Sequence, residues 1–92
     1  MKILIVDDEP GLAVGLAAWL EESGWGTLGV ATTSDEAVEW INRNGNVDVL
    51  VCDVVIKPLD GFTLRESIQP HLPKMRTIFI SGYDLSEHTA RM

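Results

Sequence analysis

Two short apolar runs, each ending in aspartate, constrain this chain more than any other feature of its sequence. Residues 3–6 lead directly into Asp7 and Asp8, and residues 49–52 lead directly into Asp53. Runs this short and this wholly apolar are typical of strands that are buried on both faces, as in a parallel sheet. Ligands of open parallel sheets bind outside the carboxyl ends of the strands, so we expect the three carboxylates to meet in one cleft.

Three carboxylates in one cleft need a positive group among them. Like charges at close range resist joint ionisation unless a cation neutralises them. Carboxylate oxygens are hard ligands and suit Mg2+, which keeps several of its waters when it binds. The sequence therefore predicts a Mg2+ site formed by Asp7, Asp8 and Asp53.

The composition is that of one globular domain. The 92 residues are 46% hydrophobic and 23% charged, which argues against a disordered chain. A formal net charge of -7 disfavours direct binding to nucleic acid or to an anionic membrane, although acidic surfaces also simply aid solubility. We find no signal peptide and no apolar run long enough to span a bilayer, so we expect a cytoplasmic protein. The single cysteine, Cys52, lies in an apolar run and is expected to be a buried structural thiol.

Strands and helices are expected to alternate along the chain. Strands are predicted at residues 2–6, 27–31, 47–52 and 77–80, and helices at residues 10–23, 33–44 and 62–68, with a further helix beginning within residues 84–92. Thr33 and Glu36 have the spacing of a capping box, in which each side chain accepts a hydrogen bond from the other residue's N–H. The order of elements predicts a parallel sheet with right-handed crossovers and helices on both faces.

Helical spacing predicts which side chains of the first two helices face the sheet. In the first helix these are Leu12, Leu16, Trp19 and Leu20, and in the second they are Ala37, Val38, Trp40 and Ile41.

With these motifs in place, the chain resembles the receiver domains of two-component response regulators. The resemblance covers essentially the whole chain and rests on five features in the expected order: Asp7-Asp8, Asp53, Pro58, Asp60-Gly61 and Ser81-Gly82. It implies a flavodoxin-like α/β fold with strand order 2-1-3-4. It also implies one receiver domain over residues 1–92 that is truncated at the C-terminus, without the family's fifth strand and last helix.

The resemblance also implies roles for individual residues. Asp53 would accept a phosphoryl group from a sensor histidine kinase or a phosphotransfer protein. Asp8, Asp53 and the backbone carbonyl of Val55 would bind Mg2+ directly, and Asp7 would act mainly through a water. Ser81 would be the switch hydroxyl that bonds a phosphoryl oxygen. Such a domain is a switch and not an enzyme.

Two departures from the family pattern leave alternatives open. Lys57 stands where the family usually has the proline of this loop, and no residue can be assigned to the switch aromatic or the lysine of the fifth strand. One alternative is therefore a degenerate receiver that docks to a partner without being phosphorylated. Another is a Mg2+-dependent phosphatase with Asp53 as nucleophile, which Val55 disfavours because it stands where such enzymes have a general acid.

The predicted strand order places residues 77–80 at the edge of the sheet. An edge strand presents unpaired N–H and C=O groups that another chain can pair with, and loss of the last helix would expose apolar surface beside the first helix. We therefore expect the 92-residue chain to self-associate, through residues 77–80 or by exchange of its C-terminal segment.

Overall fold

Strands and helices alternate in the order that the apolar runs predict. The computed structural model describes residues 1–24 and 26–80. Its elements are β1 (Lys2–Val6), α1 (Pro10–Glu22), β2 (Thr27–Ala31), α2 (Ser34–Asn44), β3 (Val49–Asp53), α3 (Gly61–Ile68) and β4 (Arg76–Ile80). The strand β3 begins later than predicted and includes Asp53. The helix expected within residues 84–92 lies outside the described residues.

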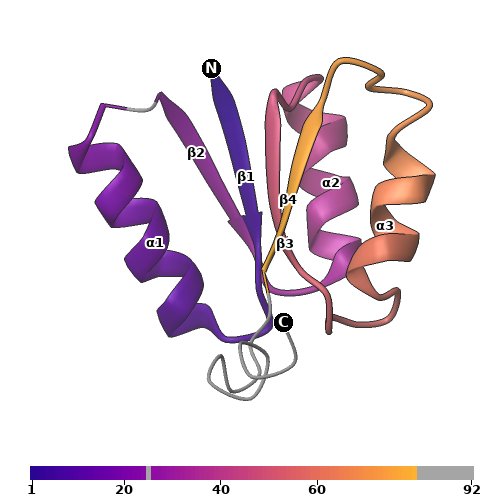
Figure 1. Ribbon diagram of the computed structural model, residues 1–92, viewed down its shortest axis with the longest axis horizontal. Helices are drawn as coiled ribbons and strands as arrows, with labels where there is room; N and C mark the ends of the chain where they lie inside the picture. The colour runs from indigo at the N-terminus through magenta and orange to yellow at the C-terminus, as the bar shows by residue number, and fades with distance from the viewer. Residues whose placement is uncertain (25, 81–92) are drawn as a thin grey trace, which may run out of the picture.

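The strands form one parallel sheet in the order β2-β1-β3-β4. Figure 1 shows α1 on one side of this sheet and α2 and α3 on the other. This is the predicted flavodoxin-like α/β fold, and the predicted strand order is confirmed. The strands run toward the lower end of Figure 1, so their carboxyl ends gather there. Within the described ranges, each helix is too short or too polar to cross a membrane.

The helix α1 contacts the sheet through a different face from the predicted one. The residues in contact are Ala13, Leu16, Ala17 and Leu20, which have the i, i+3, i+4, i+7 spacing of one helical stripe. Leu12 and Trp19 are 54% and 61% exposed, so the prediction was wrong for these two residues. The small side chains of Ala13 and Ala17 turn toward the sheet, and the bulky residues on either flank remain at the surface.

The helix α2 begins at a side-chain cap. The Thr33 hydroxyl accepts a hydrogen bond from the N–H of Glu36 at 3.0 Å, as the capping box predicts. The Glu36 carboxylate bonds the N–H of Thr32 at 2.7 Å, one residue further back than predicted, and this bond lowers the pKa of Glu36. The helix ends at Gly45, whose positive φ of 76° suits a residue without a Cβ.

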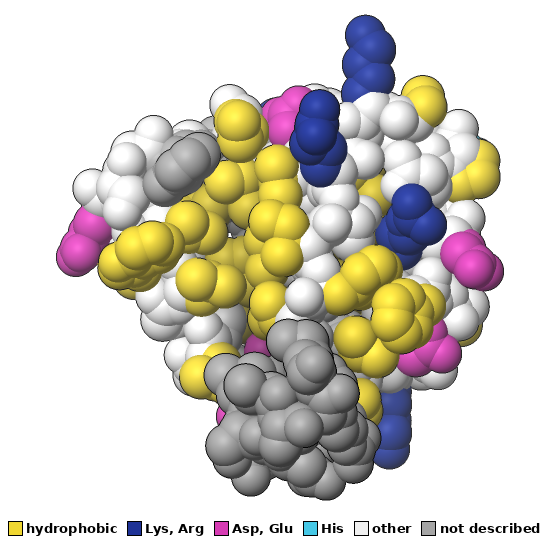
Figure 2. Space-filling view, viewed as in Figure 1, with side chains coloured by type: hydrophobic (Ala, Val, Ile, Leu, Met, Phe, Trp, Pro, Cys, Tyr) yellow, Lys and Arg dark blue, Asp and Glu magenta, His cyan; other side chains and the backbone are white. Residues whose placement is uncertain are grey.

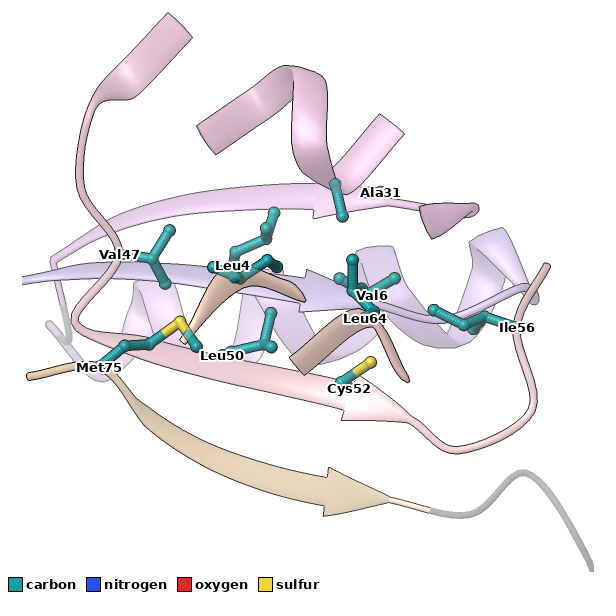
Figure 3. Packing of buried hydrophobic residues seen from close by; sticks show 11 residues of the cluster. Leu4, Val6, Ala31, Val47, Leu50, Cys52, Ile56, Leu64 and Met75 are labelled. Carbon is teal, nitrogen blue, oxygen red and sulfur yellow. The ribbon is translucent and has the colours of Figure 1, made fainter. Parts of the chain in front are cut away.

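The core between the sheet and the helices α2 and α3 is built from alternate strand residues. Leu4 of β1 and Leu50 and Cys52 of β3 gather on one side of the sheet with Leu64 of α3 (Figure 3). Cys52 is fully buried, as predicted, and burial raises the pKa of its thiol to about 12. The thiol is therefore protonated at neutral pH and is a structural group.

The helix α2 contacts this core through Ala37, Trp40 and Ile41. These positions share one helical face, and Val38 falls outside it and is exposed, so the prediction for Val38 was wrong. Trp40 lies over β2 at Gly29, where an added Cβ would collide with the indole ring. Gly29 therefore makes room for the tryptophan, a role that the sequence did not reveal.

Apolar side chains also remain at the surface beside α1 and β4. Ile3, Ile5 and Val51 form the core of the α1 side of the sheet, and Ile80 packs against them. The strand β4 is at the edge of the described sheet, and its Ile78 is 55% exposed. Figure 2 shows hydrophobic side chains gathered down the middle of the visible face.

Replacing Gly29 by Ala is expected to destabilise the fold by about 1–3 kcal/mol, because the new methyl group overpacks the Trp40 ring. Gly15→Ala is the matched control. Nothing lies within 4 Å of a Cβ at Gly15, so this change in a helix should raise stability by up to about 1 kcal/mol. Urea unfolding of both variants tests the claim. Equal effects of the two substitutions would contradict it.

Candidate metal centre

The register of β1 and β3 brings the three aspartates together. Val6 and Cys52 are register partners, so Asp7 and Asp53, which follow them, lie at the same end of neighbouring strands. Asp8 is the next residue along the chain. One carboxylate oxygen from each of these aspartates lies within 4.8 Å of the others. The structure thus brings the three carboxylates close together, as the sequence predicts.

Two of these carboxylates are buried. Asp7 is 3% exposed and Asp53 is 1% exposed, whereas Asp8 is exposed to solvent. Each buried carboxylate accepts one backbone hydrogen bond: Oδ1 of Asp7 from the N–H of Glu9 at 2.9 Å, and Oδ1 of Asp53 from the N–H of Val55 at 3.1 Å. These bonds orient the carboxylates and leave a second oxygen on each.

No lysine or arginine in residues 1–24 and 26–80 forms an ion pair with these carboxylates. The ion pair found in this part of the chain joins Arg43 to Glu39 on the surface of α2. Burying a charge without a partner costs free energy. This cost appears as a shift in the pKa of Asp7. Burial raises its pKa above the ordinary 3.8, and the charges of Asp53 and Asp8 raise it further, against the lowering effect of the Glu9 N–H.

The oxygen donors therefore fit a small divalent cation. A cation among the three carboxylates would relieve the repulsion between them and stabilise their charged forms. Carboxylate oxygens, with waters completing the shell, are what Mg2+ takes in proteins. The carbonyl of Val55, which the sequence also assigned to the metal, belongs to the residue whose N–H holds Asp53. Its binding to a metal stays a prediction.

The loop between β3 and α3 is held at both of its ends. The N–H of Val54 donates to the carbonyl of Ile80 at 3.0 Å, and the N–H of Gly61 donates to the carbonyl of Val54 at 2.8 Å. Gly61 lies so close to β3 that a Cβ would collide with the carbonyl oxygen of Asp53. Asp60 caps α3 by accepting from the N–H of Thr63 at 2.8 Å. Asp60-Gly61 therefore ends the loop and seats α3 against Asp53.

The remaining site residues divide into those that the sequence identified and one that it missed. Ser81, the expected switch hydroxyl, lies outside the described residues, and it follows Ile80, the register partner of Asp53. Lys57 is exposed in the loop. Ser34, which the sequence reading passed over, is buried and bonds this loop from the start of α2. No local pattern signals it, because its partner is 25 residues away.

Comparison with known proteins gives a consistent result. A family model described as the response regulator receiver domain matches residues 3–92. The chain is 35% identical over 82 residues to the sensor kinase CckA of Brucella abortus, an alignment that covers 88% of this chain and 9% of that protein. It is 31% identical over 84 residues to the phyllosphere-induced regulator PhyR of Methylorubrum extorquens, covering 89% of this chain and 31% of that protein. The chain thus spans less than a third of either relative.

Solved structures show the same fold. A response regulator receiver domain protein from Clostridium thermocellum matches with a TM-score of 0.80 and 28% identity, over 99% of this chain and 73% of that chain. A response regulator from Burkholderia pseudomallei, solved with a phosphorylated aspartic acid, a calcium ion and citrate, matches with a TM-score of 0.80 and 24% identity. That match covers 90% of this chain and 48% of the other.

Replacing Asp7 by Asn is expected to stabilise the metal-free protein at neutral pH. Because the pKa of Asp7 is raised in the folded state, the folded protein binds a proton more tightly than the unfolded chain. The free energy of unfolding therefore falls as the pH rises from the ordinary 3.8 through the raised pKa. Asp7→Asn removes this loss and keeps an oxygen for the N–H of Glu9. We therefore expect the free energy of unfolding at pH 7 to be higher for Asp7→Asn than for the original protein.

Urea unfolding without divalent cations, from pH 7 down to about pH 4, measures this difference. The gain should shrink as the pH falls toward the ordinary pKa of aspartate, because Asp7 then becomes increasingly protonated in both the folded and the unfolded state. Asp35→Asn, at an exposed position on α2, is the control and should show no gain. An Asp7→Asn protein no more stable than the original at pH 7 would contradict the account.

Proposed function

The chain belongs to the family of response regulator receiver domains, and on this premise we propose that it is a phosphoacceptor switch in which Asp53 takes a phosphoryl group in the presence of Mg2+. The observation that carries the proposal is the cluster of Asp7, Asp8 and Asp53 at the carboxyl end of the sheet. Asp53 is buried within it and oriented by the N–H of Val55. A nucleophile fixed beside a divalent cation is the main requirement of phosphoryl transfer.

The hydrogen bond at Asp53 supports a proposal for the atoms of this step. The N–H of Val55 engages Oδ1 of Asp53, which leaves Oδ2 to attack the phosphorus of the donor. An O–P bond forms as the bond from phosphorus to the leaving atom breaks, and the leaving group departs with that electron pair. When bound, Mg2+ would neutralise charge on the phosphoryl oxygens. Asp8 and Asp53 would hold it there, with Asp7 acting mainly through a water, and the hydroxyl of Ser81 would donate to a phosphoryl oxygen of the product.

We propose a sensor histidine kinase or a phosphotransfer protein as the donor. The similarity to a sensor kinase and to a regulator supports this choice, because both relatives carry a sequence like this one. The product, an acyl phosphate on Asp53, adds charge and strong hydrogen-bond acceptors at a loop-lined cleft, which is the kind of change that biases a switch. The proposal is thus a signalling module of a phosphorelay, in which chemistry at Asp53 sets the state of the domain.

The two alternatives make different demands on the site. A phosphatase needs a general acid near the nucleophile, and the apolar side chain of Val55 cannot supply a proton. A degenerate receiver has no need for three carboxylates around one point, yet the cluster of Asp7, Asp8 and Asp53 is complete. The cluster of three carboxylates therefore supports phosphorylation over these alternatives.

Incubation with acetyl phosphate and Mg2+ is expected to add one phosphoryl group, at Asp53. Intact-mass measurement detects it, and Asp53→Asn should abolish it because the nucleophilic oxygen is lost. Asp8→Ala should reduce it strongly, whereas Asp35→Asn, at an exposed acidic position outside the cluster, should leave it unchanged. A phosphorylated Asp53→Asn protein would identify a different acceptor. An unmodified wild-type protein that still binds Mg2+ would favour the degenerate receiver.

Self-association of the 92-residue chain is a separate proposal that rests on β4. Its edge position and the exposed Ile78 support it, since an apolar edge strand pairs readily with another chain. Light scattering at micromolar concentration should show a species larger than the monomer, and Ile78→Lys should reduce it. Val30→Lys on β2, the other edge strand, is the control and should have less effect. A monomeric wild-type protein would rule the proposal out.

A further inference from the structure

Ser34 is the one buried polar side chain of the described residues that the proposed function has not yet used. The buried polar or charged residues in this part of the chain are Asp7, Ser34 and Asp53. Two of them are carboxylates of the metal cluster. The third, Ser34, is 0% exposed and is the first residue of α2.

Ser34 contacts the loop that follows Asp53 at two points. Its N–H donates to the carbonyl of Lys57 at 2.9 Å, and its Oγ accepts from the N–H of Leu59 at 3.0 Å. These two loop groups lie on either side of Pro58. One residue at the start of α2 therefore holds a three-residue stretch of the loop by backbone and side chain together.

The other anchors of this loop lie nearer its ends. Val54 is bonded to Ile80, Gly61 is bonded to Val54, and the side chain of Ile56 is buried in the core. Between Ile56 and the cap of α3, the hydrogen bonds that tie the loop to another element within the described residues come from Ser34. Releasing them would free the middle of the loop.

The middle of this loop is close in sequence to Val55, whose carbonyl is predicted to bind the metal. Val55 precedes Lys57 by two residues, and its N–H orients Asp53. The family resemblance also assigns the carbonyl of Val55 to Mg2+, which stays a prediction. Mg2+ requires a strict arrangement of its ligands. Residues that hold those ligands in position therefore affect metal binding, and loss of such a residue commonly weakens the affinity for the metal.

We propose that Ser34 is a positioning residue for the metal centre, which fixes the turn that carries Val55 by holding Lys57 and Leu59. The inference rests on the proposed function, because it presumes that the cluster of Asp7, Asp8 and Asp53 binds Mg2+. It adds a residue outside the acidic cluster that sets the strength of that binding.

The first test is Mg2+ titration of Ser34→Ala, followed through the amide shifts of Asp7, Asp8 and Asp53. Loss of the hydroxyl leaves the N–H of Leu59 without its partner and should weaken Mg2+ binding about tenfold. Ser67→Ala is the matched control. Ser67 is also a helical serine whose hydroxyl bonds the backbone, donating to the carbonyl of Leu64 at 2.8 Å, and its loss should leave the Mg2+ affinity unchanged.

A second measurement uses the wild-type chain and does not depend on a variant that folds. Coupling between two sites is reciprocal, so if the bond from Leu59 to Ser34 favours Mg2+, then Mg2+ must favour that bond. Saturating Mg2+ should slow hydrogen exchange at the Leu59 amide by a similar factor. The amide of Gln69, bonded to Arg65 at the end of α3, should show no comparable change.

The outcomes separate the inference from the function beneath it. Mg2+ affinity equal in Ser34→Ala and wild type, with Leu59 exchange unaffected by Mg2+, would overturn the role of Ser34 and leave the metal centre intact. Mg2+ binding that is unchanged in Asp8→Ala would instead show that the acidic cluster is not the site, and the proposed function would fail with it. Weaker Mg2+ binding in Ser34→Ala, with unchanged Mg2+ binding in Ser67→Ala, supports the inference.

Discussion

Repulsion among buried carboxylates is the constraint on which the organisation of this protein depends. Register between β1 and β3 places Asp7 next to Asp53, and the core around the strands keeps water away from both. Burial raises the pKa of Asp7, and the charges of Asp53 and Asp8 raise it further. A fold that buries carboxylates in this way favours binding of a cation, because the cation relieves the repulsion between them and stabilises their charged forms.

Packing in the core holds the strands and the loop around Asp53 in place. Leu4 and Leu50 are buried in the same core, between the sheet and the helices α2 and α3. They hold together β1 and β3, the two strands that carry the aspartates. Gly61 lets α3 approach the end of β3 closely, so the loop after Asp53 is short and tied at both ends. Ser34 ties its middle to α2. Asp53, the loop and the helices α2 and α3 are therefore one connected unit.

The sequence predicted the features that depend on neighbours in the chain. Apolar runs ending in aspartate defined the strands and the acidic cleft, and the spacing of Thr33 and Glu36 located the start of α2. It failed where the outcome depends on how elements meet in space. Trp19 was expected inside, but small alanines bring a different stripe of α1 to the sheet. Gly29 and Ser34 act through Trp40 and Leu59, contacts that no local spacing reveals.

The central claim, that Asp7, Asp8 and Asp53 bind one divalent cation, can be tested with Mn2+ in place of Mg2+, since both are bound by carboxylate oxygens. Mn2+ is paramagnetic and broadens the NMR signals of nearby nuclei. The account predicts that substoichiometric Mn2+ removes the amide signals of these three aspartates first and leaves those of Glu21 and Glu22, at the far end of α1, sharp. Broadening centred on the far end of α1, or spread evenly over the acidic residues, would contradict it.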